Sequence, residues 1–113
     1  MPNLPPSLYA ETAHPAPPTP ALDGEIRTTV CVVGGGFTGL STALHLAEYD
    51  VDVVVLEAEE PGWGASGRNG GQVNPGLKFN PDDVEKHHSL SLGGRMLGLS
   101  HSPPADVFDL VRR

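Results

Sequence analysis

Three glycines at a fixed spacing are the residues of this chain whose chemistry is easiest to define. Gly34, Gly36 and Gly39 form the pattern G-x-G-x-x-G, which is typical of turns that bind the pyrophosphate of a dinucleotide. The first glycine allows a tight turn, the second lets the backbone approach the phosphates, and the third lets a helix pack closely on a strand. The amides and the positive dipole end at a helix N-terminus also favour an anion there. The pattern predicts a diphosphate site, and its structural alternative is a glycine-rich turn without a ligand.

An acidic residue follows the glycines at the distance that such a site needs. Glu57 lies 18 residues after Gly39, at the end of a second apolar run. A carboxylate in this position accepts hydrogen bonds from the ribose hydroxyls of a dinucleotide. Because its charge repels a 2′-phosphate, Glu57 also disfavours NADP as the ligand.

Two short apolar runs on either side of the motif predict the strands that position it. Residues 28–33 and 51–56 are rich in β-branched side chains, which is typical of strands buried on both faces. Between them, apolar residues recur at the spacing of one helix face; these are Leu40, Ala43, Leu44 and Ala47. We therefore expect a βαβ unit with parallel strands and a right-handed crossover. The fold class is α/β, a Rossmann-like βαβ start of an FAD/NAD(P)-binding domain that is incomplete.

A second glycine cluster follows the second strand, within residues 59–76. Repeated glycines allow the main chain to lie against a flat ligand, and Ser66, Arg68 and Asn69 supply hydrogen-bond donors. A loop of this length in a compact domain is usually functional or disordered. We interpret it as part of a site for a large cofactor, with a flexible linker as the alternative, and Trp63 as a packing anchor.

The N-terminal residues predict an extended leader. Seven of the twelve prolines lie in the first 20 residues, and proline fixes φ and removes a backbone donor. The leader is either disordered or an arm that lies on the folded body, with Leu4, Leu8 and Tyr9 as anchors.

The C-terminal residues predict short helices. Asn80 and Pro81 have the residue types of an N-cap and a first helical position. A weaker helical pattern covers Leu92–Leu99 and is broken by a proline pair, and another helix is expected to start at Asp106.

Composition excludes several classes of protein. The chain has 113 residues and a net charge of −7, which argues against binding to nucleic acid or to an anionic membrane. The single cysteine, Cys31, excludes an internal disulfide and is expected to be buried in its strand. Neither a membrane span nor a secretory signal is present in the sequence, so we expect a cytoplasmic protein. His87 and His88 are interpreted as solvated rather than metal-binding, and no metal site is assigned.

The motifs taken together resemble the start of the FAD-dependent amine oxidoreductases, the superfamily of D-amino acid oxidase, glycine oxidase and sarcosine oxidase. Within it, the chain is most similar to the gamma-glutamylputrescine oxidoreductase subgroup. The runs that carry the resemblance are Val30–Ser41, Val53–Ala58 and Gly62–Gln72. The resemblance implies FAD as cofactor and hydride transfer to FAD from the C–N bond of a small amine or amino acid. It also implies reoxidation, commonly by dioxygen to give hydrogen peroxide.

The resemblance also assigns cofactor contacts. It places the three motif glycines at the pyrophosphate, Glu57 at the adenosine ribose, and the second cluster at the phosphates, ribityl chain and isoalloxazine edge. The full set of expected cofactor-binding residues is Gly34, Gly36, Phe37, Thr38, Gly39, Glu57, Ala58, Ala65, Ser66, Arg68, Asn69, Gly70, Gly71 and Gln72. No catalytic residue is assigned.

The chain departs from the family in two respects. The family usually has a glycine between the helix and the second strand, where Tyr49 and Asp50 stand here. Family members are also several times longer, and include a sheet-based substrate domain. We therefore expect an N-terminal fragment that is inactive alone. Its segments would be a leader (1–24), an FAD-binding βαβ unit with its flavin loop (25–76) and a partial helical segment (77–113).

Two alternatives remain open. One is a non-catalytic dinucleotide-binding module that a partner chain completes. The other is a fragment of an NAD-dependent dehydrogenase, against which the loop from Gly62 to Gln72 argues, because a plain NAD-binding domain continues with another helix and strand.

Overall fold

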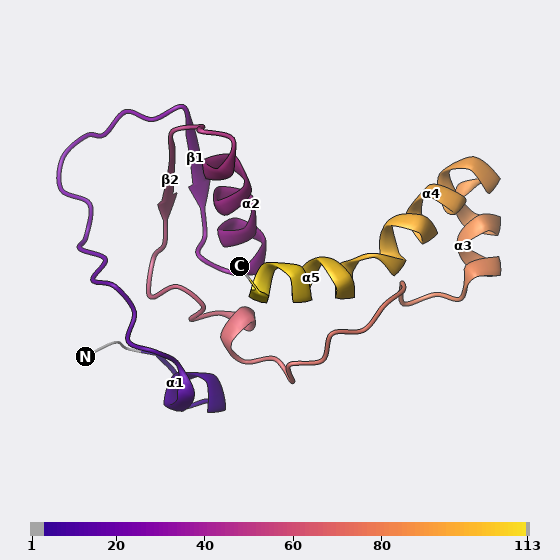
Figure 1. Cartoon of the computed structure of the whole chain (residues 1–113), viewed down its shortest axis with the longest axis horizontal. Coiled ribbons are helices and arrows are strands. Elements are labelled where there is room, and N and C mark those ends of the chain that lie inside the picture. The colour runs from indigo at the N-terminus through magenta and orange to yellow at the C-terminus, as the bar shows by residue number, and fades with distance from the viewer. Residues whose placement is uncertain (1–3, 113) are drawn as a thin grey trace. The chain divides into compact units, whose positions relative to one another are not determined.

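The computed structural model describes residues 4–112, and the chain divides into two units, Met1–Gly70 and Gly71–Arg113 (Figure 1). The boundary between the units lies inside the second glycine cluster, six residues before the end of the segment expected to bind the cofactor. The two units are described separately.

The first unit contains the expected βαβ arrangement. Strand β1 (Val30–Val33) and strand β2 (Val53–Leu56) are parallel, and helix α2 (Phe37–Glu48) connects them (Figure 1). The register pairs Val30 with Val53 and Val33 with Leu56, and α2 packs against both strands. The prediction of an α/β fold with a parallel strand pair is confirmed.

The turn that leads from α2 into β2 works without the glycine that the resemblance suggests. Asp50 adopts a φ of 57°, in the left-handed region that usually favours glycine. Aspartate and asparagine tolerate this region better than most residues do. The amides of Asp50 and Val51 donate to the carbonyl groups of Ala47 and Leu46. These bonds satisfy two of the carbonyls that a helix end leaves without partners.

Burial of the strands differs from the expectation. Val30 and Val32 are half-buried on the face that α2 covers, whereas Cys31 and Val33 are exposed, Val33 to 83 %. Successive side chains of a strand point to opposite faces, so β1 is covered on one face only, whereas all four residues of β2 are half-buried. The predictions that β1 is buried on both faces and that Cys31 is buried are therefore wrong, and β2 is half-buried on both faces rather than fully buried.

The leader contains one short helix that the sequence analysis did not anticipate. Helix α1 (Leu8–Thr12) occupies the gap between two proline groups, and the Oγ atom of Ser7 caps it by accepting from the amide of Ala10 at 3.1 Å. Residues 13–29 have no helix or strand, in keeping with their proline content.

The second unit contains three helices within residues 71–112. Helix α3 (Pro81–His88) begins as expected, since the Oδ1 atom of Asn80 accepts from the amide of Asp83 at 3.1 Å. Helix α4 (Leu90–His101) packs against α3, with Val84 only 2 % exposed between them. Helix α5 (Pro103–Arg112) begins three residues before the predicted start. The proline pair opens this helix, because a first turn needs no intrahelical amide donors.

Candidate dinucleotide-binding site

The glycine motif joins β1 to α2, which is the structural context that a dinucleotide turn requires. Gly34 follows the strand with a φ of 104°, and its amide extends the strand pairing by donating to the carbonyl of Leu56 at 2.7 Å. Gly36 is the N-cap of α2. A residue with a Cβ atom would be strained at position 34, so the first glycine has the role that the motif predicts.

The third glycine allows close packing of the helix. A Cβ atom at Gly39 would overlap the carbonyl oxygen of Gly34 and lie 3.1 Å from the carbonyl carbon and 3.3 Å from Cγ1 of Val32. The first turn of α2 is therefore in direct contact with the end of β1. This contact fixes the direction in which the N-terminus of α2 points.

The second glycine leaves an open backbone at the start of the helix. A Cβ atom at Gly36 would meet only side-chain atoms of Ser66, the nearest being Oγ at 2.9 Å. The amide of Phe37 donates to this same Oγ atom at 2.9 Å. Within residues 4–112, the structure gives no acceptor for the amides of Gly36 and Thr38. These donors, at the positive end of the α2 dipole, fit a diphosphate group.

Glu57 lies directly after β2 and faces the glycine turn. Its Oε2 atom accepts from the amide of Gly35, and its Oε1 atom accepts from the amide of Glu59 at 3.1 Å. A carboxylate can accept about four hydrogen bonds, so Glu57 retains acceptor capacity for ribose hydroxyls.

The same amides affect the acidity of Glu57. The hydrogen bond from Gly35, and then that from Glu59, hold the pKa of this carboxyl below its usual value. A carboxyl whose pKa is lower in the folded chain stabilises the fold at pH values above its unfolded pKa. That contribution is lost as the pH falls through the folded pKa. Glu57 is therefore ionised at neutral pH, and its predicted repulsion of a 2′-phosphate requires this charge.

Gly35 has a role that the sequence analysis missed. It is buried, and a Cβ atom there would lie 3.1 Å from Oε2 of Glu57 and 3.3 Å from Cα of Pro61. Its carbonyl accepts from the amide of Gly62 at 2.9 Å. The motif requires only two glycines at positions 34–36, and the third consecutive glycine is the signal that could have identified this residue.

The donors of the second glycine cluster largely bind the loop itself. The Nε atom of Arg68 donates to the carbonyl of Trp63 at 2.9 Å, and its guanidinium lies 4.3 Å from the centre of the Trp63 ring. The Nδ2 atom of Asn69 donates to the carbonyl of Ser66 at 2.7 Å. A 3₁₀ turn, η1 (Ala65–Gly67), holds this segment. The loop therefore has a defined shape of its own, in which the exposed Trp63 ring contacts the Arg68 guanidinium.

The remaining expected contact residues lie on the surface. Thr38, Ala58, Ala65 and Gly70 are exposed residues of the first unit. Gly71 and Gln72 are exposed residues of the second unit, where the Oε1 atom of Gln72 accepts from Asn74 at 3.5 Å. The contacts of all fourteen expected residues with a cofactor stay predictions.

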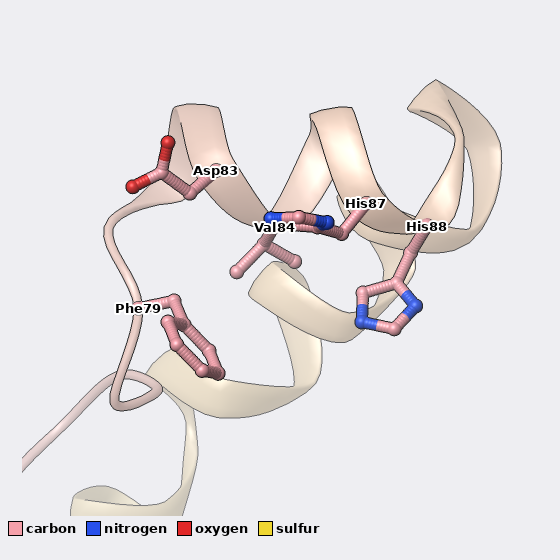
Figure 2. Close-up of a pocket in the computed structure, with 5 residues that line it drawn as sticks. All are labelled: Phe79, Asp83, Val84, His87 and His88. Atoms are coloured by element: carbon pink, nitrogen blue, oxygen red, sulfur yellow. The ribbon is translucent and has the colours of Figure 1, made fainter.

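The second unit has a separate pocket of about 380 Å³ (Figure 2). Phe79 lines it from the segment before α3, and Asp83, Val84, His87 and His88 line it from α3 itself. Both histidines are exposed. The described residues contain no group of three or more histidine, cysteine, aspartate or glutamate side chains that could hold a metal ion.

None of the helices in residues 4–112 has the length and hydropathy of a membrane span.

Comparison with known proteins identifies relatives across most of the chain. The family model described as "FAD dependent oxidoreductase" (DAO) matches residues 29–112. Gamma-glutamylputrescine oxidoreductase of Escherichia coli is 52 % identical over 92 residues, which are 81 % of this chain and 21 % of that protein. The proteins named probable oxidoreductase OrdL of Rhizobium meliloti and Haemophilus influenzae are 40 % and 42 % identical over 71 % of this chain and 19 % of their own length. The chain thus spans about a fifth of the length of these curated relatives. No solved structure matches the chain significantly.

Proposed function

This chain belongs to the FAD-dependent oxidoreductase (DAO) family, and from that premise we propose that the turn between β1 and α2 binds the adenosine diphosphate part of FAD. The observation that carries the proposal is the placement of the Glu57 carboxylate beside the glycine turn, where it accepts from the amide of Gly35. Ribose hydroxyls and a diphosphate are adjacent in FAD, and this turn offers an acceptor for the first and amide donors for the second.

Each end of the proposed site matches one part of the cofactor. The amides of Gly36 and Thr38, at the start of α2, would hold the pyrophosphate. Glu57 would bind the adenosine ribose and reject a 2′-phosphate. The loop of residues 61–70, which is attached to the turn through Gly35 and Ser66, would extend the site towards the ribityl chain and the flavin.

When bound, FAD supplies the redox chemistry by accepting a hydride from the carbon of a substrate C–N bond. The relative from Escherichia coli is named for a glutamylated amine, which supports a small amine or amino acid as the substrate of the whole protein. Reoxidation by dioxygen to hydrogen peroxide and a cytoplasmic location belong to the same proposal. Among the described residues we assign roles in cofactor binding only, and we expect no turnover of amines by the 113-residue chain alone.

A titration with related nucleotides tests the proposal. We expect the chain to bind FAD and ADP, and to bind FMN at least about tenfold more weakly than FAD, since FMN lacks the adenosine diphosphate that the glycine turn would hold. Flavin fluorescence quenching and calorimetry measure the affinities. Equal affinity for FMN and FAD would contradict the proposal.

The same titration separates FAD from the nicotinamide alternative. NAD shares its adenosine diphosphate half with FAD, so the turn alone cannot distinguish them. If the loop of residues 61–70 contacts the flavin, FAD binds more tightly than both ADP and NAD. A chain that prefers NAD would instead be part of a nicotinamide-dependent dehydrogenase.

The exposed face of β1, with Cys31 and Val33, favours a second candidate function. In that case the chain is a non-catalytic dinucleotide-binding module, and a partner chain that carries the remaining flavin contacts covers this face. Copurification of such a partner in a yellow complex would favour the module.

A further inference from the structure

The side chain of Ser66 connects two segments that are 29 residues apart in the sequence. Its Oγ atom accepts from the amide of Phe37, the first residue of α2, at 2.9 Å. A second connection lies nearby, where the amide of Gly62 donates to the carbonyl of Gly35 at 2.9 Å. The loop of residues 61–70 is therefore attached to the dinucleotide turn at two points by the protein's own atoms.

The loop is also held in one shape between these two points. Gly62 and Gly67 are so close that a Cβ atom at Gly67 would overlap the carbonyl oxygen of Gly62. Within the same loop, the side chain of Arg68 donates a hydrogen bond to the carbonyl of Trp63 and lies over its ring. A shift at Ser66 would therefore move the whole segment rather than a single side chain.

The bond at Phe37 determines which backbone amides are open to a bound nucleotide. Because the amide of Phe37 donates to Ser66, it is not available to a diphosphate, whereas the structure gives no protein acceptor within residues 4–112 for the amides of Gly36 and Thr38. Removing the hydroxyl would free one more amide for the anion at the helix N-terminus. Loss of the hydroxyl should therefore not weaken binding of the diphosphate itself.

We propose that Ser66 is a positioning residue that docks the loop of residues 61–70 on the N-terminus of α2 and so aligns the flavin part of the site with its diphosphate part. This inference rests on the proposed function. The family resemblance implies that Ser66 contacts the cofactor directly, whereas here its role is to accept the hydrogen bond from the amide of Phe37.

Affinities for ADP and FAD test the proposal, because only FAD reaches beyond the diphosphate. For Ser66→Ala we expect an affinity for FAD about tenfold lower, the size expected for one lost hydrogen bond, and an affinity for ADP that is equal or slightly higher. Ser66→Thr keeps the hydroxyl and should restore FAD binding. Equal losses for ADP and FAD would show a direct phosphate contact and overturn the proposal, as would unchanged FAD binding.

Amide hydrogen exchange provides a readout that needs no nucleotide. In Ser66→Ala, we expect faster exchange at Phe37 and Gly62, with the rates restored in Ser66→Thr and unchanged in β2. Unchanged exchange at both amides would overturn the docking role. If the unaltered chain binds neither ADP nor FAD, the proposed function fails, and the exchange result alone then decides whether Ser66 docks the loop.

Discussion

Replacement of Gly39 by alanine is expected to abolish FAD binding and to unfold the βαβ unit. The added Cβ atom would overlap the carbonyl oxygen of Gly34 and crowd its carbonyl carbon at 3.1 Å. Both are backbone atoms at the end of β1, so no side-chain rotation relieves the overlap, and α2 must move away from the strand. Overpacking typically costs about 1–3 kcal/mol and occasionally more, and a clash of two backbone segments belongs at the upper end, which is a large part of the stability of a small domain.

Urea unfolding followed by circular dichroism measures this effect, and Gly98→Ala is a matched control. Gly98 lies in α4, and a Cβ atom there would meet nothing within 4 Å. Since alanine favours a helix over glycine by about 1 kcal/mol, Gly98→Ala should be neutral or stabilising. A Gly39→Ala chain that unfolds at the same urea concentration as the unaltered chain would contradict the close packing of α2 on β1.

Replacement of Gly67 by alanine is expected to lower the affinity for FAD by about 100-fold, which corresponds to about 2.7 kcal/mol of binding free energy. The affinity for ADP should change by less than about threefold. The Cβ atom would overlap the carbonyl oxygen of Gly62 and lie 3.2 Å from its carbonyl carbon. The turn from Gly62 to Gly67 must then open. Opening it moves Gly62 and Ser66, which are the two residues that attach the loop to the dinucleotide turn.

Gly64→Ala is the control within the same loop. Gly64 has a φ of −75°, and a Cβ atom there would meet nothing within 4 Å. Its affinities for FAD and ADP, measured by calorimetry beside those of Gly67→Ala, should match the unaltered chain within about twofold. Equal effects of the two substitutions on FAD binding would show that the shape of the loop does not matter for the cofactor.

The βαβ unit could be predicted from the sequence because each of its parts has a local signal. Apolar runs, helical spacing and the glycine pattern all lie within residues 28–57, and the parallel pairing follows from the connecting helix. Burial of the strands could not be predicted in this way, because it depends on what covers each face. Cys31 and Val33 have the residue types of a core strand, yet they are exposed on the uncovered face of β1.

The position of Glu57 beside the glycine turn was predictable, but the hydrogen-bond partners of the loop residues were not. Glu57 was expected beside the glycine turn and lies there, since strand and motif together fix its position. The bonds of Ser66 to Phe37 and of Gly62 to Gly35 join segments far apart in the sequence. No periodicity or spacing reports such pairings, which arise only when the loop folds back on the turn. The bond of Arg68 to Trp63 spans only five residues, but it depends on the folded shape of the loop and was not anticipated either.

Titration of the isotope-labelled chain with ADP, followed by NMR of its backbone amides, tests the central claim most directly. ADP contains the nucleotide part that the turn between β1 and α2 should hold, and no flavin. We expect the largest chemical-shift changes at Gly36 and Thr38, with smaller changes around Glu57 and none in α3 to α5. Changes confined to the pocket beside His87 and His88, or no saturable change at the glycine turn, would contradict the claim.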